Sequence, residues 1–166
     1  EIARKKAIDN YKIDVIESAD LQKINGNFNV ITMWHVLEHV SELKKCVSEL
    51  NRLITDDGKI VIGVPNLNSF DSKYYKEYWA AYDLPIHLSH FTKDTITKLF
   101  NNHGFSLRKT KGMIFDSFYV SMLSEEHKSG KKKFVKSLII GLISNFHGIF
   151  TKKGFSSTIY VFEKQK

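Results

Sequence analysis

The chain has 166 residues, the length of one ordinary domain, and we expect a single domain over residues 1–166. Its 42% hydrophobic and 13% aromatic content is enough to form a buried core, which excludes intrinsic disorder. One cysteine, Cys46, excludes an intramolecular disulfide and a cysteine-rich zinc module, and it fits a reducing, cytoplasmic location. The 25 basic and 18 acidic residues give a formal charge of +7, an excess that favours nucleic acid or an anionic membrane as partner.

The positive charge is concentrated in the last third of the chain. Residues 121–166 contain nine lysines and three glutamates, so the rest is nearly neutral and we expect no nucleic acid partner. Lysines at 131–133 and 152–153 nevertheless bracket an apolar stretch. The alternative function is therefore a module that binds a membrane or a nucleic acid through residues 131–153. The simpler interpretation of these lysines is that they only solvate a helix. The apolar stretch, Ser137–Phe150, is shorter than the ~20 residues of a transmembrane helix.

The first half of the chain alternates between helix and strand. Apolar residues at helical spacing predict a helix over Ile2–Tyr11. Two runs of mostly β-branched and aromatic residues, Ile13–Ile16 and Phe28–Trp34, predict strands. An amphipathic helix capped by Ser41 then leads through an Asp-Asp-Gly turn into a third strand, Lys59–Val64. Strand, helix and strand with short links predict an α/β protein with a parallel sheet.

The second half contains a long aromatic segment and a predicted helical insertion. Residues 66–91 are irregular and rich in tyrosine, and loops of this length are usually functional. A helix capped by Thr92 precedes a strand at Phe105–Lys109. Residues 112–154 form an insertion or lid, with a helix over Lys131–Phe150 whose large apolar residues fall on one stripe. The last predicted strand is Ser157–Phe162.

The densest group of reactive side chains, His35, Glu38 and His39, directly follows the strand Phe28–Trp34. Ligands of parallel sheets bind at the carboxyl ends of the strands, so chemistry is expected here. The spacing also matches the H-x-x-E-H pattern of zinc proteases, in which two histidines one helical turn apart bind Zn²⁺. That pattern needs a long helix and a distant acidic ligand, whereas Glu38 and His39 could simply open the next helix. We predict no metal, and a metal on His35, Glu38 and His39 is the weaker alternative.

The segment Phe28–Val40 resembles the fourth-strand motif of class I S-adenosylmethionine-dependent methyltransferases, which typically reads FDVI…VLEHV. Asn29 stands where that motif usually has Asp. Residues 48–59 resemble the family's helix and turn, el.R.LkpgG, and Asp83–Thr92 resembles the dlPrHl.hF segment of one branch. The resemblance implies a truncated Rossmann-like α/β sheet with an antiparallel last strand, S-adenosylmethionine as cofactor, and methyl transfer.

The glycine-rich loop of that family, which holds the amino-acid end of the cofactor, has no counterpart here, because the 166 residues contain no G-x-G-x-G. The chain starts at Glu1 without a methionine, and its first helix resembles the helix after the family's second strand. We therefore expect the C-terminal two thirds of a methyltransferase. Alone, it should bind the cofactor poorly and be inactive.

The resemblance places the cofactor at the ends of two predicted strands. After the first, relatives bind the adenine amino group with an acidic side chain, for which Glu17 and Asp20 are equal candidates. The second ends beside the methionine moiety of the cofactor, although core packing is the alternative for Met33 and Trp34. The candidate cofactor-binding residues are Glu17, Ser18, Ala19, Asp20, Met33, Trp34 and His35.

Two histidines, His35 and His87, are the candidate catalytic residues, because a histidine near its usual pKa could remove a proton from the acceptor. Tyr82, His87 and His90 are the candidate substrate-binding residues, with loop ordering or simple packing as the alternative. His39 should point away from the reaction centre. We expect S-adenosylmethionine-dependent methylation of a small-molecule or lipid-linked acceptor.

Overall fold

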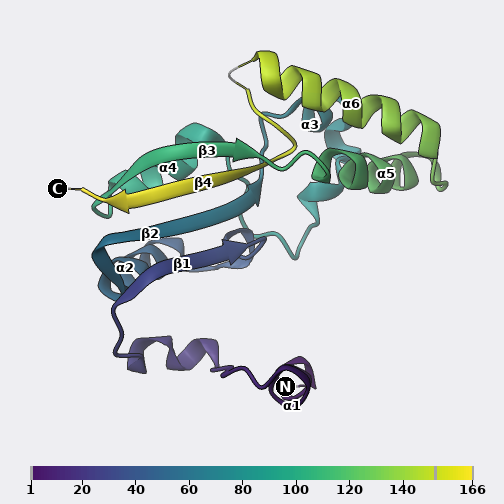
Figure 1. Cartoon of the computed structure of the whole chain (residues 1–166). Helices are drawn as coiled ribbons and strands as arrows, with labels where there is room; N and C mark the ends of the chain where they lie inside the picture. The colour runs from purple at the N-terminus through teal and green to yellow at the C-terminus, as the bar shows by residue number, and fades with distance from the viewer. Residues whose placement is uncertain (1, 152, 166) are drawn as a thin grey trace.

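The computed structural model describes residues 2–151 and 153–165, without the side chains of residues 3 and 18–20. Its strands form one sheet in the order β1-β2-β4-β3 (Figure 1). β1 and β2 are parallel, and β4 is antiparallel to both of its neighbours, which confirms the predicted antiparallel last strand. The strands are β1 (Phe28–Trp34), β2 (Ile54–Pro65), β3 (Phe105–Gly112) and β4 (Ser157–Lys164).

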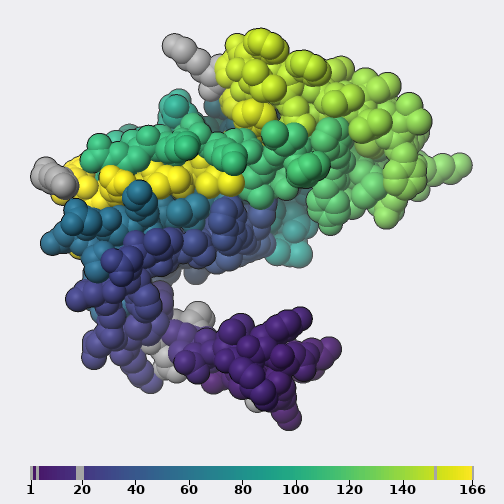
Figure 2. Space-filling view, viewed as in Figure 1, coloured from purple at the N-terminus to yellow at the C-terminus, as the bar shows by residue number. Residues whose placement is uncertain are grey.

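The predicted strand at Ile13–Ile16 was wrong. This segment is coil between helix α1 (Ile2–Tyr11) and the 3-10 helix η1 (Ser18–Lys23), and Ile13 and Ile16 are exposed. A strand needs a neighbour for its backbone groups, and in the described part of the chain β1 pairs with β2 alone. Figures 1 and 2 show the N-terminal segment standing apart from the body of the sheet, beyond β1.

One face of the sheet carries the main hydrophobic core. Two amphipathic helices, α2 (Leu43–Leu53) and α4 (Lys93–Asn101), lie on that face, behind the sheet in Figure 1. Alternate β2 residues point into it because side chains of a strand alternate between its two faces. The Phe100 and Phe162 rings stack there with centroids 4.1 Å apart. The fully or nearly fully buried members from the strands are Ile54, Ile60, Ile62, Val64, Phe105, Tyr160 and Phe162.

Two predicted boundaries in this region were also wrong. α2 begins at Leu43 with Glu42 as its N-cap, so Ser41 does not cap it. The Asp-Asp-Gly sequence lies inside β2 instead of before it. Phe28 pairs with Ile54 and Val30 with Lys59, so β2 advances five residues where β1 advances two. The turn-forming residues therefore make a bulge within the ladder. Thr92 does cap α4, through a hydrogen bond from the Thr95 amide.

A second group of helices packs at the carboxyl ends of β1 and β2 (Figure 1). Residues 66–91, predicted as irregular, form α3 (Phe70–Tyr75) and the 3-10 helices η3 (Lys76–Tyr78) and η4 (Ala80–Tyr82). Between β3 and β4 lie α5 (Asp116–Ser129) and α6 (Phe134–Phe150), within the segment expected as an insertion. These helices share a core of their own around Tyr75, Trp79, Val120 and Ile140.

Buried Asp71 joins these helices to the sheet. Its Oδ2 accepts hydrogen bonds from Trp79 Nε1 at 2.8 Å and Ser156 Oγ at 2.7 Å, and its Oδ1 accepts one from Ser144 Oγ at 2.7 Å. The three donors come from the end of η3, from the approach to β4 and from α6. The helices are thereby fixed above the strand ends. None of the described helices has the length and apolarity to cross a membrane.

Candidate active site

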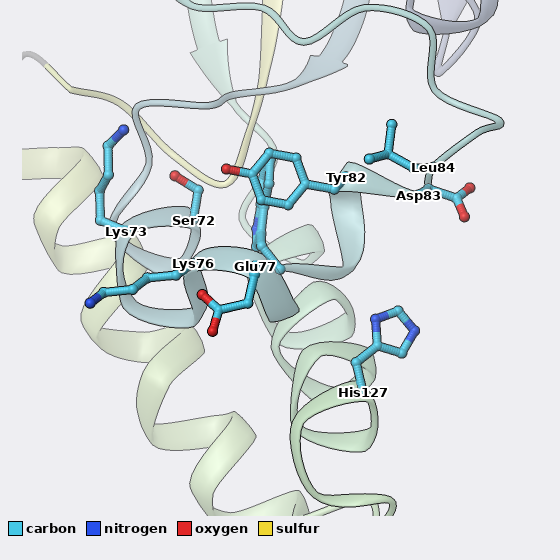
Figure 3. A pocket seen from close by; sticks show the side chains of 9 residues that line it. Ser72, Lys73, Lys76, Glu77, Tyr82, Asp83, Leu84 and His127 are labelled. Carbon is cyan, nitrogen blue, oxygen red and sulfur yellow. The ribbon is translucent and has the colours of Figure 1, made fainter.

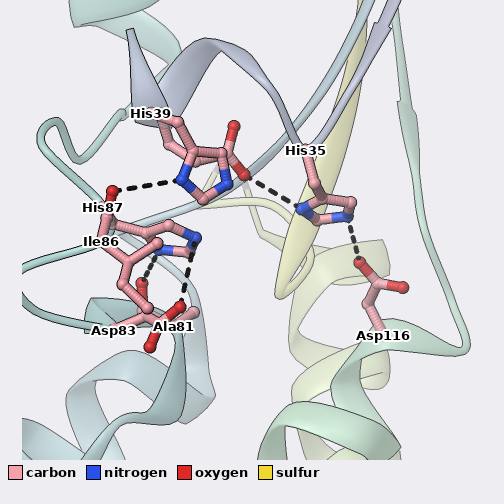
Figure 4. Close-up of polar contacts among 8 residues, drawn as sticks. His35, His39, Ala81, Asp83, Ile86, His87 and Asp116 are labelled. Atoms are coloured by element: carbon pink, nitrogen blue, oxygen red, sulfur yellow. Dashed lines mark hydrogen bonds and ion pairs between the residues drawn. The ribbon is translucent and has the colours of Figure 1, made fainter. Parts of the chain in front are cut away.

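His35 directly follows β1 and turns the chain at the edge of the sheet. Its backbone N–H still donates to Gly63 O on β2 at 2.9 Å, but its φ is +49°. Positive φ is uncommon for a residue with a Cβ, and it is often found at functional sites. The turn directs the imidazole toward α5 instead of along the strand (Figure 4).

Two carboxylates bracket the His35 ring. Nδ1 lies 3.1 Å from Glu38 Oε1, and Nε2 lies 3.1 Å from Asp116 Oδ2 in the first turn of α5 (Figure 4). The hydrogen bond to Asp116, then that to Glu38, outweighs partial burial and raises the pKa of His35 to about 9. Burial alone would raise the pKa of Asp116, but His35 and Ser157 hold it below its usual value. His35 is therefore a cation at neutral pH and is not free to accept a proton.

His39 and His87 form a second pair beside Glu38. Their rings meet edge to face with centroids 4.7 Å apart. Each Nδ1 faces a backbone carbonyl, that of Ile86 at 3.1 Å for His39 and that of Ala81 at 2.8 Å for His87 (Figure 4). Those contacts make Nδ1 the donor nitrogen of each ring, and Nε2 of His87 lies 4.0 Å from Asp83 Oδ2 (Figure 4).

Glu38, His39 and His87 could together hold a divalent cation. Their ligand atoms all lie within 4.8 Å of one another, and the buried Glu38 Oε2 has no hydrogen-bond partner. The set differs from the His35, Glu38 and His39 group considered from the sequence, because His35 is directed to Asp116. Glu38 and His39 also do not open α2, since they form the 3-10 helix η2 (Leu37–His39). The long helix that the zinc-protease pattern needs is thus not formed here.

A cavity of about 420 Å³ brings the two catalytic candidates together. His35, His87 and Asp116 line it, together with Tyr119 and Leu123 from α5. Asp83 and His127 also line this cavity and are shared with a second, more open one of about 900 Å³. Figure 3 shows this second cavity, with Tyr82 on one side and His127 on α5 below it. Tyr82 lines the second cavity, whereas His87 lines the first, so these two substrate-binding candidates lie in neighbouring cavities.

His90 contacts Tyr82 of the same segment. Its Nε2 lies 3.0 Å from Tyr82 O, and its ring meets the Tyr82 ring edge to face with centroids 5.2 Å apart. His90 lines neither of the two cavities. These contacts agree with the loop-ordering alternative for this residue.

The cofactor candidates fall into different environments. Met33 packs against the sheet core, whereas Trp34 is about half exposed. A Cβ on Gly63 would come 2.9 Å from Trp34 Cε3, so the glycine makes room for the Trp34 ring across β2. The Glu17 carboxylate pairs with Arg4 Nη1 at 2.6 Å. The side chains of the candidates Ser18, Ala19 and Asp20 lie outside the described residues.

The sequence did not indicate Asp116 as part of the site. Asp116 is 81 residues from His35 and has no motif around it. The contact depends on how α5 packs over the end of β1, which local residue patterns do not encode. Glu38 was considered only as a helix-opening residue or a weak metal ligand, although its carboxylate is buried.

Comparisons with known proteins identify the family and the fold of this chain. The sequence profile described as "Methyltransferase domain" matches residues 2–110. This chain belongs to that methyltransferase family. The match covers β1, β2 and most of β3, and it ends before α5 and α6. No curated protein matches the sequence.

Solved methyltransferase structures share the fold at low sequence identity. One is the complex between the Haloferax volcanii Trm112 methyltransferase activator and a methyltransferase (8% identity, TM-score 0.54), where the match covers 84% of this chain and 55% of that chain. The mitomycin 7-O-methyltransferase MmcR (6%, TM-score 0.52) is matched over 87% of this chain and 32% of its own. LaPhzM (15%, TM-score 0.52) is matched over 66% and 35%. This methyltransferase chain thus spans about a third to a half of these relatives.

Proposed function

We propose that this chain carries the acceptor pocket and part of the cofactor site of an S-adenosylmethionine-dependent methyltransferase. The observation that carries the proposal is the cavity at the end of β1, where His35, His87 and Asp116 meet from three separate segments. Family membership supports methyl transfer as the reaction. A cavity of about 420 Å³ suits a small molecule or the head group of a lipid-linked acceptor.

The exposed Trp34 ring fits a cofactor site at the carboxyl end of β1. It offers an apolar face next to the His35 turn, at the position that the family resemblance assigns to the methionine moiety. Glu17 would have to exchange its Arg4 partner for an adenine amino group. S-adenosylmethionine would supply the electrophilic methyl group. The protein's part is to orient the acceptor and to exclude water.

We assign different roles to the two catalytic candidates. His87 is buried, and its Nδ1 is held by the Ala81 carbonyl, so Nε2 is the nitrogen that can take a proton from a hydroxyl or amine acceptor. His35, already protonated, acts as a positioning residue that ties α5 to the end of β1. Of the two candidates, we therefore assign the general base to His87, in the loop before α4, and not to His35 at the end of β1.

Calorimetric titration with S-adenosylmethionine tests whether this chain contains only part of the cofactor site. We expect no saturable binding by these 166 residues tighter than about 1 mM, because they contain no glycine-rich loop to hold the amino-acid end of the cofactor. Micromolar binding would show that the full set of cofactor contacts lies within this chain and would overturn the assignment.

A further inference from the structure

α6 presents its large apolar side chains to solvent. The stripe expected from the sequence is present, but it faces outward, with members between 41% and 79% exposed. Figure 2 shows α6 as a yellow-green ridge at the upper right of the molecule, clear of the sheet. A contiguous apolar surface on a helix ~25 Å long marks a binding surface. We call it the α6 apolar face, formed by Phe134, Val135, Leu138, Ile139, Leu142, Ile143, Phe146, Ile149 and Phe150.

The opposite face of α6 fixes this orientation. Apart from Ile140, its buried residues are small or polar, and it packs against α5 and α3. A Cβ on Gly141 would come 2.5 Å from Phe118 Cδ1 and 3.1 Å from Phe118 Cα, so a larger residue does not fit there. Ser144 Oγ donates to Asp71 Oδ1 at 2.7 Å, and Asn145 Nδ2 donates to Ile114 O at 2.9 Å. Rotation of the helix to bury its apolar face would break these contacts.

The surroundings of the α6 apolar face are basic. Residues 127–162 contain seven lysines and no acidic residue, and Glu125 and Glu126 on α5 pair with three of them, Lys132, Lys133 and Lys136. Lys133 and Lys136 lie at the start of α6, where the positive end of the helix dipole makes cations unfavourable. Their ion pairs with the buried Glu125 leave both side chains 40% or more exposed. The two glutamates offset only part of the positive charge, and the excess that remains beside the apolar face is complementary to an anionic partner.

We propose that the α6 apolar face docks on an anionic lipid surface. Its aliphatic and phenyl groups would enter the boundary between head groups and acyl chains, while the flanking lysines meet the acidic head groups. A second copy of the chain is a poorer match, because face-to-face packing would bring two sets of lysines together. The proposal does not depend on the methyl-transfer function, since it rests on α6 alone.

Vesicle flotation tests the proposal directly. The chain should bind vesicles of phosphatidylglycerol and phosphatidylcholine, bind pure phosphatidylcholine far less, and dissociate at about 0.5 M salt. Leu138→Gln/Leu142→Gln should weaken binding at least tenfold because apolar burial is lost. Lys131→Gln/Lys132→Gln/Lys133→Gln should weaken it about 100-fold on the anionic vesicles only.

The matched control is Ile2→Gln/Ile8→Gln, which changes two exposed apolar residues on helix α1 and should leave vesicle binding unchanged. Circular dichroism melting should show that the α6 variants stay folded. The proposal is overturned if anionic vesicles do not bind or if Leu138→Gln/Leu142→Gln leaves binding unchanged. It is also overturned if sedimentation equilibrium shows a dimer that Leu138→Gln/Leu142→Gln abolishes while vesicles stay unbound. Binding to duplex DNA that only the lysine variant removes would assign the lysines to nucleic acid instead.

Discussion

His35 shows how its surroundings change the chemistry of a residue. From the sequence it is a histidine at a strand end and a reasonable general base. In the structure, carboxylates lie 3.1 Å from each ring nitrogen, and they stabilise the charged form. The position of His35 at the end of β1 follows from the sequence, whereas its protonation state depends on Asp116, which the fold supplies from α5.

The raised pKa of His35 predicts a specific pH dependence of stability. A histidine that is protonated more readily in the folded state stabilises the fold fully below its unfolded pKa of 6.5, and that contribution is lost as the pH rises through about 9. The difference in Tm between the native chain and His35→Gln should therefore be largest below pH 6.5 and should shrink toward pH 9. Thermal unfolding monitored by circular dichroism measures it.

Asp116→Asn is the matched partner variant for this test. It should remove part of the same pH dependence, because Glu38 still stabilises the charged imidazole. Adding it to His35→Gln should change the profile little further, because the contact with Asp116 is already lost in that variant. A Tm difference that stays constant between pH 6 and 9 would show that His35 is not preferentially charged in the fold.

At the scale of elements, the helical group depends on one buried carboxylate. Asp71→Ala should lower the free energy of unfolding by about 3–5 kcal/mol, because Trp79, Ser144 and Ser156 would each lose a buried acceptor. Urea unfolding measures the change. Asp56→Ala is the control, since Asp56 is exposed and pairs only at the surface with Lys164, and it should change stability by less than about 1 kcal/mol. Similar values for both variants would contradict the structural role of Asp71.

Element prediction worked where a local pattern was sufficient. Phe28–Trp34, rich in β-branched and aromatic residues, is a strand that pairs with β2, and Thr92 is an N-cap in sequence and in structure. It failed at Ile13–Ile16, because β-branched residues favour a strand only when a neighbouring strand pairs with them. The stripe on α6 was recognised, but periodicity identifies an apolar face without saying what covers it.

For the whole molecule, the Rossmann-like sheet with its antiparallel last strand was predicted from the family motif and is confirmed, whereas the acceptor cavity was not predicted. The cavity is built largely by α5, η4 and the loop to α4, whose contacts join residues 35, 87 and 116. The α6 apolar face then gives the molecule a second surface, distinct from this cavity. The proposed acceptor cavity and the proposed docking surface therefore lie in separate parts of the chain.

The central claim is that the cofactor meets this chain at the carboxyl end of β1, next to the acceptor cavity. Titration of the ¹⁵N-labelled chain with S-adenosylhomocysteine at millimolar concentration, followed by amide chemical shifts, tests it most directly. We predict concentration-dependent shifts at Met33, Trp34 and His35 and in residues 17–21, with α6 unaffected. Shifts confined to α5 and α6, or no shifts at the end of β1, would contradict the account.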